Sequence, residues 1–304
     1  MGRTLLAGDS NTAWREWLKH HGDADLVHLD PSDAHFGPAG RLLRVRSGKV
    51  VGWRFYGSLD ARRAPHLLVA GAAELLAEAG PDAVVQLFPL RRSPLLRQLA
   101  LLLDDLVAPE RILTPEGAGV ETLGWSIGPE SVARESAFPE MVRHAQRKAQ
   151  WLRMLEEGTV AEVPLATLSI RGARLGSGHP IPRTDLDALG LVHVSHAELC
   201  GKTLLLVAET EPDDASVARA LDRCHAQTLH RVPPGAYAGL LAALGRDRGE
   251  PLAIGRVETI DFRHGVVRVR STMQEGAGAR TLLLGGVRLD EDGNEGPELR
   301  PWQV

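Results

Sequence analysis

The 304-residue sequence is poor in cysteine and in aromatic residues, and it contains no long apolar run. Two cysteines, Cys200 and Cys224, are too few for a disulfide framework, and the N-terminus lacks the pattern of a secretory signal. The most apolar helical candidate, residues 95–107, is too short to span a bilayer and carries Asp104 and Asp105. We therefore expect a soluble protein of the reducing cytoplasm that has no membrane segment.

The net charge and the positions of the histidines argue against two further properties, an overall attraction to nucleic acid and a structural metal site. The net charge of −4 argues against an overall electrostatic attraction to nucleic acid, so any such binding must be local. None of the 12 histidines combines with other His or Cys residues at the spacing of a zinc site, and no structural metal is expected. A hydrophobic content of 43% is enough for a substantial core, and the length predicts roughly two domains.

The first half alternates short apolar runs with longer helix-like segments, which predicts a mostly parallel sheet covered by helices. The expected strands are residues 4–7, 26–29, 84–87 and 111–114, and the expected helices are residues 12–20, 65–79 and 94–107. Residues 41–55 differ, because Ser47-Gly48 between two apolar runs indicates a hairpin. A long basic helix is expected over residues 135–157.

The composition changes after this basic helix. Residues 172–182 are rich in Gly and Pro, and the later apolar segments are short and broken by glycines. Alternating patterns predict strands over residues 253–260, 266–270 and 281–289. We therefore place a domain boundary near residue 160, between an α/β domain of residues 1–160 and a β-rich domain of residues 161–304.

The strand at residues 4–7 leads into a degenerate phosphate-binding loop, which reads Gly8-Asp9-Ser10-Asn11-Thr12-Ala13-Trp14-Arg15. A working loop has Gly, four residues, then Gly-Lys-Ser/Thr, whose backbone amides, lysine and hydroxyl hold phosphates and Mg²⁺. The spacing from Gly8 is right, but Ala13, Trp14 and Arg15 replace the glycine, the lysine and the hydroxyl. Taken alone, the match is weak, and a strand-to-helix turn that binds no ligand is the simpler interpretation of the segment.

Four segments downstream of this loop form an ordered set of motifs: Asp30 with Gly37, Pro38 and Gly40; Phe55-Tyr56-Gly57-Ser58; the basic helix with Arg143 and Arg147; and residues 237–241, 253–262, 267–270 and 284–289. The set resembles the polynucleotide 5′-hydroxyl kinases of RNA processing, which serve in tRNA splicing, messenger 3′-end cleavage complexes and pre-ribosomal RNA maturation. The chain departs from that family where Ser32 and Asp33 replace its Gly-Gln. A Thr-x-Gly-Trp turn is also missing after residues 84–87.

The resemblance implies a P-loop-type, mostly parallel sheet with helices in residues 1–160, followed by a small C-terminal β-rich domain in residues 161–304. It places Asp30 near the metal and the attacking 5′-hydroxyl, as magnesium partner or general base. The helix at 135–157 would be an arginine-rich lid. Basic residues that are candidates for phosphate contacts are Arg62, Arg63, Arg143 and Arg147.

Three functional hypotheses follow. The preferred one is a kinase-like protein without catalysis and without a bound cofactor, which binds RNA or DNA 5′ ends or a protein partner in RNA processing. The alternative is an active RNA or DNA 5′-hydroxyl kinase with an atypical site for ATP and Mg²⁺.

The third hypothesis is a serine esterase of the Gly-Asp-Ser type, which would use Ser10 with Asp222 and His225. Such an enzyme needs an oxyanion-hole asparagine in mid-chain, but the asparagines are Asn11 and Asn294. A further phosphate loop at residues 201–203 is not expected, because the Gly-Lys-Thr there is followed by an apolar strand-like run rather than a helix.

Overall fold

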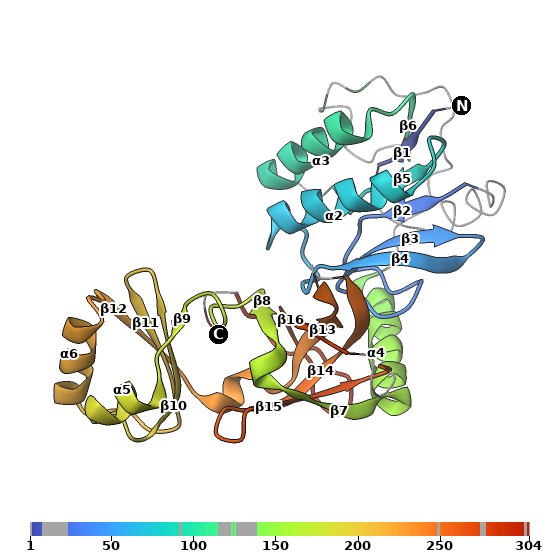
Figure 1. Ribbon diagram of the computed structural model, residues 1–304. Coiled ribbons are helices and arrows are strands. Elements are labelled where there is room, and N and C mark those ends of the chain that lie inside the picture. The colour runs from blue at the N-terminus through green and yellow to red at the C-terminus, as the bar shows by residue number, and fades with distance from the viewer. Residues whose placement is uncertain are drawn as a thin grey trace. The chain divides into compact units, whose positions relative to one another are not determined.

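The computed structural model describes residues 2–7, 24–90, 93–114, 123, 125, 139–247, 250–273, 278–300 and 303. The predicted helix at 12–20 and the degenerate loop at 8–15 lie outside these residues. The chain divides into two compact units, Met1–Trp151 and Leu152–Val304 (Figure 1).

A six-stranded sheet with strand order β4-β3-β2-β5-β1-β6 forms the centre of the first unit. Its parallel strands are β1 (Thr4–Leu6), β2 (Leu26–His28), β5 (Val84–Gln86) and β6 (Arg111–Leu113). Beside β2 lies an antiparallel hairpin of β3 (Arg41–Arg46) and β4 (Lys49–Phe55). Two of the three residues in each of these short parallel strands are apolar, because both faces of the sheet are buried. The predicted mostly parallel sheet is confirmed.

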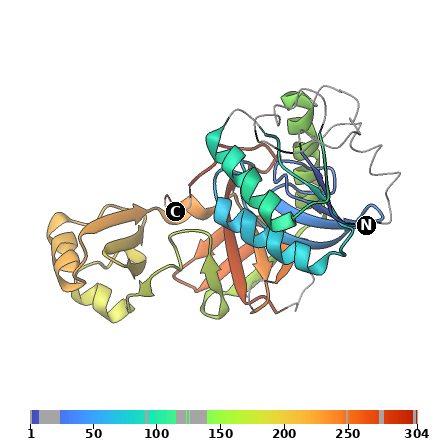
Figure 2. The same ribbon diagram turned by 90° about the horizontal axis from the view of Figure 1, so that it is seen from above.

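Two helices, α2 (Pro65–Glu78) and α3 (Pro94–Val107), cover one face of this sheet and lie side by side (Figures 1 and 2). Each begins with proline, whose missing N–H is harmless in the first turn. Leu68 and Leu75 of α2, and Leu99 and Leu103 of α3, recur at helical spacing and are fully or almost fully buried. Within the described residues, no helix combines the length and the apolar character needed to cross a membrane.

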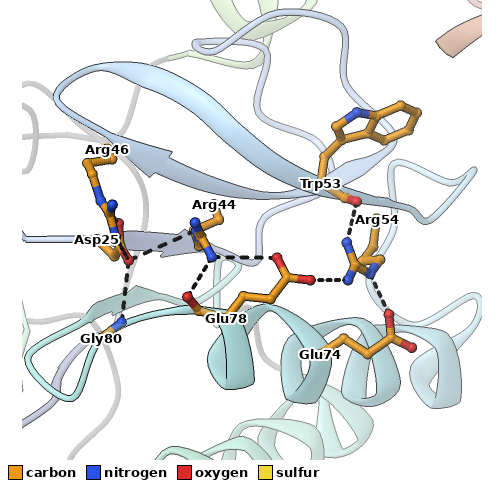
Figure 3. Close-up of polar contacts among 8 residues, drawn as sticks. All are labelled: Asp25, Arg44, Arg46, Trp53, Arg54, Glu74, Glu78 and Gly80. Carbon is orange, nitrogen blue, oxygen red and sulfur yellow. Dashed lines mark hydrogen bonds and ion pairs between the residues drawn. The ribbon is translucent and has the colours of Figure 1, made fainter. Parts of the chain in front are cut away.

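A polar network fixes the β3–β4 hairpin to the rest of the first unit (Figure 3). Asp25, just before β2, is buried, and its two oxygens accept hydrogen bonds of 2.7 Å from Arg46. Arg44 lies 4.0 Å from Asp25 and also donates to the backbone carbonyl of Glu78 in α2. Glu78 in turn pairs with Arg54 of β4. The hairpin is therefore held both to the sheet and to α2 by charged contacts.

A second six-stranded sheet forms the centre of the second unit, in the order β7-β15-β14-β13-β16-β8. Its strands are β7 (Thr159–Pro164), β8 (Ser169–Arg171), β13 (Leu240–Gly245), β14 (Pro251–Asp261), β15 (Val266–Ser271) and β16 (Thr281–Arg288). All pairings are antiparallel except that of β16 with β8. Two short 3₁₀ turns adjoin these strands in sequence. Leu165–Thr167 lies between β7 and β8, and Pro234–Tyr237 comes just before β13. The strands predicted between residues 253 and 289 are all present.

A smaller layer of β-strands and helices is inserted between β8 and β13. Its sheet has the order β12-β11-β10-β9, with β9 (His179–Pro180), β10 (Val194–Cys200), β11 (Thr203–Ala208) and β12 (Thr228–Val232). Helices α5 (Arg183–Ala188) and α6 (Asp214–Arg223) cover one face (Figure 2). Neither helix was predicted; α5, with six residues, is too short to show helical periodicity. The second unit is therefore richer in structure than a small β domain.

A buried carboxylate organises the turn that leads into this insertion. Glu198 of β10 accepts hydrogen bonds from the backbone amides of Gly176 and Gly178 and contacts the ring of His196 at 2.8 Å. Gly176 has a φ of +80°, and a Cβ there would lie 2.5 Å from the carbonyl oxygen of Ile170. Only glycine is compatible with this close approach.

The Asp25 network predicts an acid-dependent loss of stability. Hydrogen bonds from Arg46 hold the pKa of Asp25 below its ordinary value, so its contribution is present above about pH 4 and lost as the pH falls through the folded-state pKa. Asp25→Asn should lower the free energy of unfolding by about 1–2 kcal/mol at pH 7. Denaturation at pH 7 and at pH 3 should show this difference shrinking in acid.

Asp105, an exposed acid of α3, provides the control. Asp105→Asn should leave stability almost unchanged at both pH values. Equal losses for the two variants, or an Asp25→Asn loss that does not depend on pH, would contradict the proposed role of the network.

Candidate functional site

The candidate site lies at the edge of the first sheet where parallel strands β1, β2 and β5 end. Ligands of open α/β sheets bind at this carboxyl edge. Asp30 follows β2 by two residues and Phe88 follows β5 by two residues, while Ala7 follows β1 and leads into the degenerate loop. The loop residues Gly8 to Arg15 lie outside the described residues. The site is therefore built from Asp30 onward.

Asp30 is buried, with 2% of its surface exposed, and both carboxylate oxygens have partners. Oδ1 accepts hydrogen bonds from the backbone amide of Ser32 at 3.0 Å and from its hydroxyl at 2.7 Å. Oδ2 pairs with Nη2 of Arg143 at 3.1 Å, and the same nitrogen donates to the Ser32 hydroxyl. Protein donors therefore surround the carboxylate.

Burial raises the pKa of Asp30 above its ordinary value, because removal from water disfavours the charged form. Arg143 opposes this rise through its positive charge, the nearby carboxylate of Asp33 reinforces it, and His28 and Ser32 oppose it. The net direction is upward. A raised pKa suits a general base, but here three hydrogen bonds from Ser32 and Arg143 already engage the two carboxylate oxygens.

The loop after Asp30 is shaped by Arg41 at the start of β3. Its Nε donates to the carbonyl of Pro38 at 2.8 Å, its Nη2 donates to that of Phe36 at 3.4 Å, and its guanidinium lies 5.4 Å from the ring centre of Trp53. Burial lowers the pKa of Arg41 to about 10. Gly37 has a φ of +113°, and a Cβ there would lie 2.8 Å from Nη2 of Arg41. Gly37, one of the residues that carry the resemblance to the kinase family, therefore leaves space for the guanidinium group of Arg41.

Tyr56-Gly57-Ser58, another segment that carries the resemblance to the kinase family, forms the turn that leads into α2. The buried Tyr56 hydroxyl donates to the carbonyl of Ala61 at 2.8 Å and accepts from the amide of Ala64 at 3.1 Å. The Ser58 hydroxyl accepts from the amide of Asp60 at 3.0 Å. The segment thus positions Asp60 and the two arginines that follow it.

Arginines at this edge are paired with carboxylates: Arg62 with Asp60 at 2.7 Å, Arg143 with Asp30 at 3.1 Å, and Arg147 with Glu140 at 3.3 Å. Arg143 and Arg147 project from helix α4 (Glu140–Glu157). Burial would raise the pKa of Asp60, but the hydrogen bonds from Arg62 outweigh it and the pKa is lowered. Arg63 is exposed and has no ion-pair partner among the described residues.

A cavity of about 260 Å³ lies among these pairs. Its polar wall consists of Asp30, Ser32, Asp60, Arg62, Glu140 and Arg147, and its apolar wall of Leu59, Ala61, Phe88, Pro89 and Leu96. The volume is below the roughly 300–1,000 Å³ typical of sites for drug-sized ligands. The cavity therefore suits one small group, such as a single terminal residue of a polymer.

The structure brings most of the described candidate residues together. Asp30, Arg62 and Arg147 line the cavity, Arg143 contacts Asp30, and Arg63 lies beside Arg62. The sequence analysis missed Ser32, Asp60 and Glu140 as parts of this site. Ser32 could have been found from its spacing to Asp30. An aspartate side chain often accepts a hydrogen bond from the backbone amide two residues later in the chain. The pair proposed for an esterase, Asp222 and His225, lies at the end of α6 in the second unit.

The described residues do not fit a magnesium ion at Asp30. Magnesium takes oxygen ligands in octahedral geometry, usually with one or two carboxylates. Both oxygens of Asp30 are engaged, and the positive charge of Arg143 at 3.1 Å would repel a divalent cation. Asp33 is engaged by His28 at 3.0 Å. In the part of the chain that the structure describes, no three His, Cys, Asp or Glu side chains form a metal-binding group.

Comparison with known proteins places this geometry in context. No protein family model matches the chain. Among curated proteins, the chain is similar to a polyribonucleotide 5′-hydroxyl-kinase of Thermococcus kodakarensis, with 22% identity over 211 residues. The match covers 65% of this chain and 57% of that protein, so the chain spans little more than half of the curated relative's length.

Solved structures of Clp1p with Pcf11p share the fold. One of these structures concerns the extended interface of the two proteins and the loss of ATP in a point mutant. It matches with a TM-score of 0.55 and 12% sequence identity, and the match covers 94% of this chain and 75% of that chain. The wild-type complex matches with a TM-score of 0.55 and 11% identity over 94% and 74%.

The chain has a P-loop-kinase-like fold, with an α/β unit followed by a β-rich unit. Within that class, the resemblance to the polynucleotide 5′-hydroxyl kinases of RNA processing is confirmed by the curated relative and by the Clp1p structures. The fold class predicted from the sequence is confirmed with it.

The turn built by Tyr56 predicts a stability effect. Tyr56→Phe removes the acceptor of the buried Ala64 amide and should lower the free energy of unfolding by about 1–3 kcal/mol. Chemical denaturation measures the effect.

Tyr237, the other tyrosine of the chain, is the matched control. Its hydroxyl is buried without a hydrogen-bond partner among the described residues, so Tyr237→Phe should be neutral or stabilising. A loss for Tyr237→Phe as large as that for Tyr56→Phe would show that the Tyr56 hydrogen bonds are not the cause.

Proposed function

We propose that this protein is a polynucleotide 5′-hydroxyl-kinase-like component of RNA processing that binds 5′ ends without phosphorylating them. The observation that carries the proposal is the state of Asp30. It is the carboxylate that the resemblance assigns to the metal or to the attacking hydroxyl, and both of its oxygens are engaged by Ser32 and Arg143.

The chemistry of phosphoryl transfer supports a non-catalytic role. In-line transfer depends on positioning and on neutralising charge that develops on the phosphoryl oxygens. The sequence of the loop lacks the lysine and the metal-binding hydroxyl, where Trp14 and Arg15 stand. Removal of a single electrostatic donor elsewhere costs about 3–4 kcal/mol of transition-state stabilisation. Without these groups and with Asp30 occupied, transfer would be slower by orders of magnitude.

The cavity and its surroundings support binding of a polynucleotide end. Leu59 and Pro89, which are partly exposed, offer apolar contacts to one nucleoside, and the volume leaves room for no more than a terminal residue. Arg63 is exposed at the neighbouring turn and can contact a backbone phosphate at little desolvation cost. Arg62 is half-exposed but pairs with Asp60, so its contribution should be smaller.

The relatives support the choice of ligand and partner. The curated relative is named for a polyribonucleotide 5′-hydroxyl substrate, and the Clp1p structures contain the protein Pcf11p. A 5′ end of RNA, with DNA as the second possibility, is therefore the proposed ligand, and a protein subunit is the proposed partner. The alternative of an active kinase with an atypical ATP site is favoured by the name of the same relative.

The first functional prediction concerns ATP. Calorimetry should give a dissociation constant weaker than about 1 mM for ATP with Mg²⁺, equivalent to about −4 kcal/mol. No phosphate should pass from labelled ATP to a 5′-hydroxyl RNA under conditions in which an active polynucleotide kinase labels it. Micromolar affinity together with transfer would establish the alternative.

The second concerns the polynucleotide. A 3′-labelled linear RNA with a 5′-hydroxyl should bind more tightly in anisotropy titrations than a circular RNA of the same sequence. Arg63→Ala should weaken binding several-fold and reduce the slope of log affinity against log salt by about 1.

Lys49 is the control for this experiment, because it is exposed at the hairpin turn, which lies at the opposite edge of the same sheet. Lys49→Ala should leave affinity and salt slope unchanged. Equal affinity for linear and circular RNA would refute recognition of ends. Absence of binding at low salt would favour a role through the protein partner alone.

A further inference from the structure

The site of Asp30 poses a problem of charge compensation. A carboxylate with 2% exposure must have a nearby positive charge or several donors to remain ionised. In active kinases of this class, a magnesium ion supplies the positive charge near such a carboxylate. The described residues around Asp30 do not fit a magnesium ion. The compensation must come from the chain itself.

Arg143 supplies this charge. Its Nη2 lies 3.1 Å from Oδ2 of Asp30 and also contacts the hydroxyl of Ser32, which is hydrogen-bonded to Oδ1 of the same carboxylate. The guanidinium group therefore reaches the carboxylate and its hydrogen-bonding hydroxyl together. A divalent ion bound here would need oxygen from Asp30 and would stand beside a cation that cannot be deprotonated.

Among the described residues, the neighbouring carboxylates offer no second position for a metal. Asp33 accepts from His28, Asp60 is held by Arg62, and Glu140 pairs with Arg147. These three acids, like Asp30, thus each have a partner from within the first unit.

We propose that Arg143 is the resident counter-cation of Asp30 and replaces the divalent metal of an active kinase. Arg143 is then a positioning residue, whose positive charge favours the charged form of Asp30 and which fixes the first turn of α4 to the loop after β2. The proposal stands on the contacts of Asp30 and holds whether or not polynucleotide ends bind.

The first test compares metal binding of the full chain with that of Asp30→Asn. Mn²⁺, which takes the same oxygen ligands as Mg²⁺ and is visible by electron paramagnetic resonance, is the probe. The expected result is that the two proteins have the same Mn²⁺ isotherm. If the natural chain retains one Mn²⁺ that Asp30→Asn loses, the proposal is overturned.

The second test is a double-mutant cycle. Arg143→Gln should increase the unfolding equilibrium constant by at least about tenfold in the natural chain, and by much less in the Asp30→Asn background, because the buried charge is then gone. Arg143→Lys should recover a large part of the loss, since it restores the positive charge. An equal loss in both backgrounds would show that Arg143 acts only by packing and would refute the pairing.

The metal comparison remains decisive if Arg143→Gln does not fold. Asp30→Asn retains an oxygen that can accept from Ser32, and the metal comparison needs no change at Arg143. A failure of RNA binding would leave both results unaffected, so failure of the proposed function and failure of this inference can be told apart.

Discussion

The candidate site depends on how one carboxylate is kept charged away from water. Asp30 is nearly inaccessible, and its pairing with Arg143 at 3.1 Å and with Ser32 satisfies both oxygens. Because these partners come from α4 and from the loop after β2, a single buried charge orders two segments that are distant in sequence. The same contacts compete with the proton or metal that a general base or a metal ligand would bind.

Buried carboxylates organise other parts of the chain in different ways. Asp25 is compensated by arginines of a neighbouring strand, which ties the hairpin to the sheet. Glu198 is compensated mainly by backbone amides, including those of Gly176 and Gly178, which shapes a turn in the second unit. In each case the acid joins segments that are separate in sequence.

The sequence predicted the elements whose patterns are local. Short apolar runs located the parallel strands, and a leading proline with leucines at helical spacing located α2 and α3. Helix α5 was missed because six residues carry no periodic signal. Asp30 was identified by resemblance, but its partner was not, because Arg143 is 113 positions away and arginines on a basic helix give no indication of which acid they reach. Pairing of this kind is decided by the tertiary fold.

The placement of Arg143 on Asp30 has a consequence for how this chain could change over evolutionary time. Rebuilding a phosphate-binding loop at Ala13, Trp14 and Arg15 would restore one half of a kinase centre and leave the other half blocked. Removing Arg143 alone would expose an uncompensated buried charge and destabilise the fold before any activity appeared. A return to catalysis therefore requires changes in two separate segments. The change in the loop gives no activity without the change at Arg143, and the change at Arg143 destabilises the protein. The Asp30–Arg143 pair therefore makes such a return improbable by single substitutions.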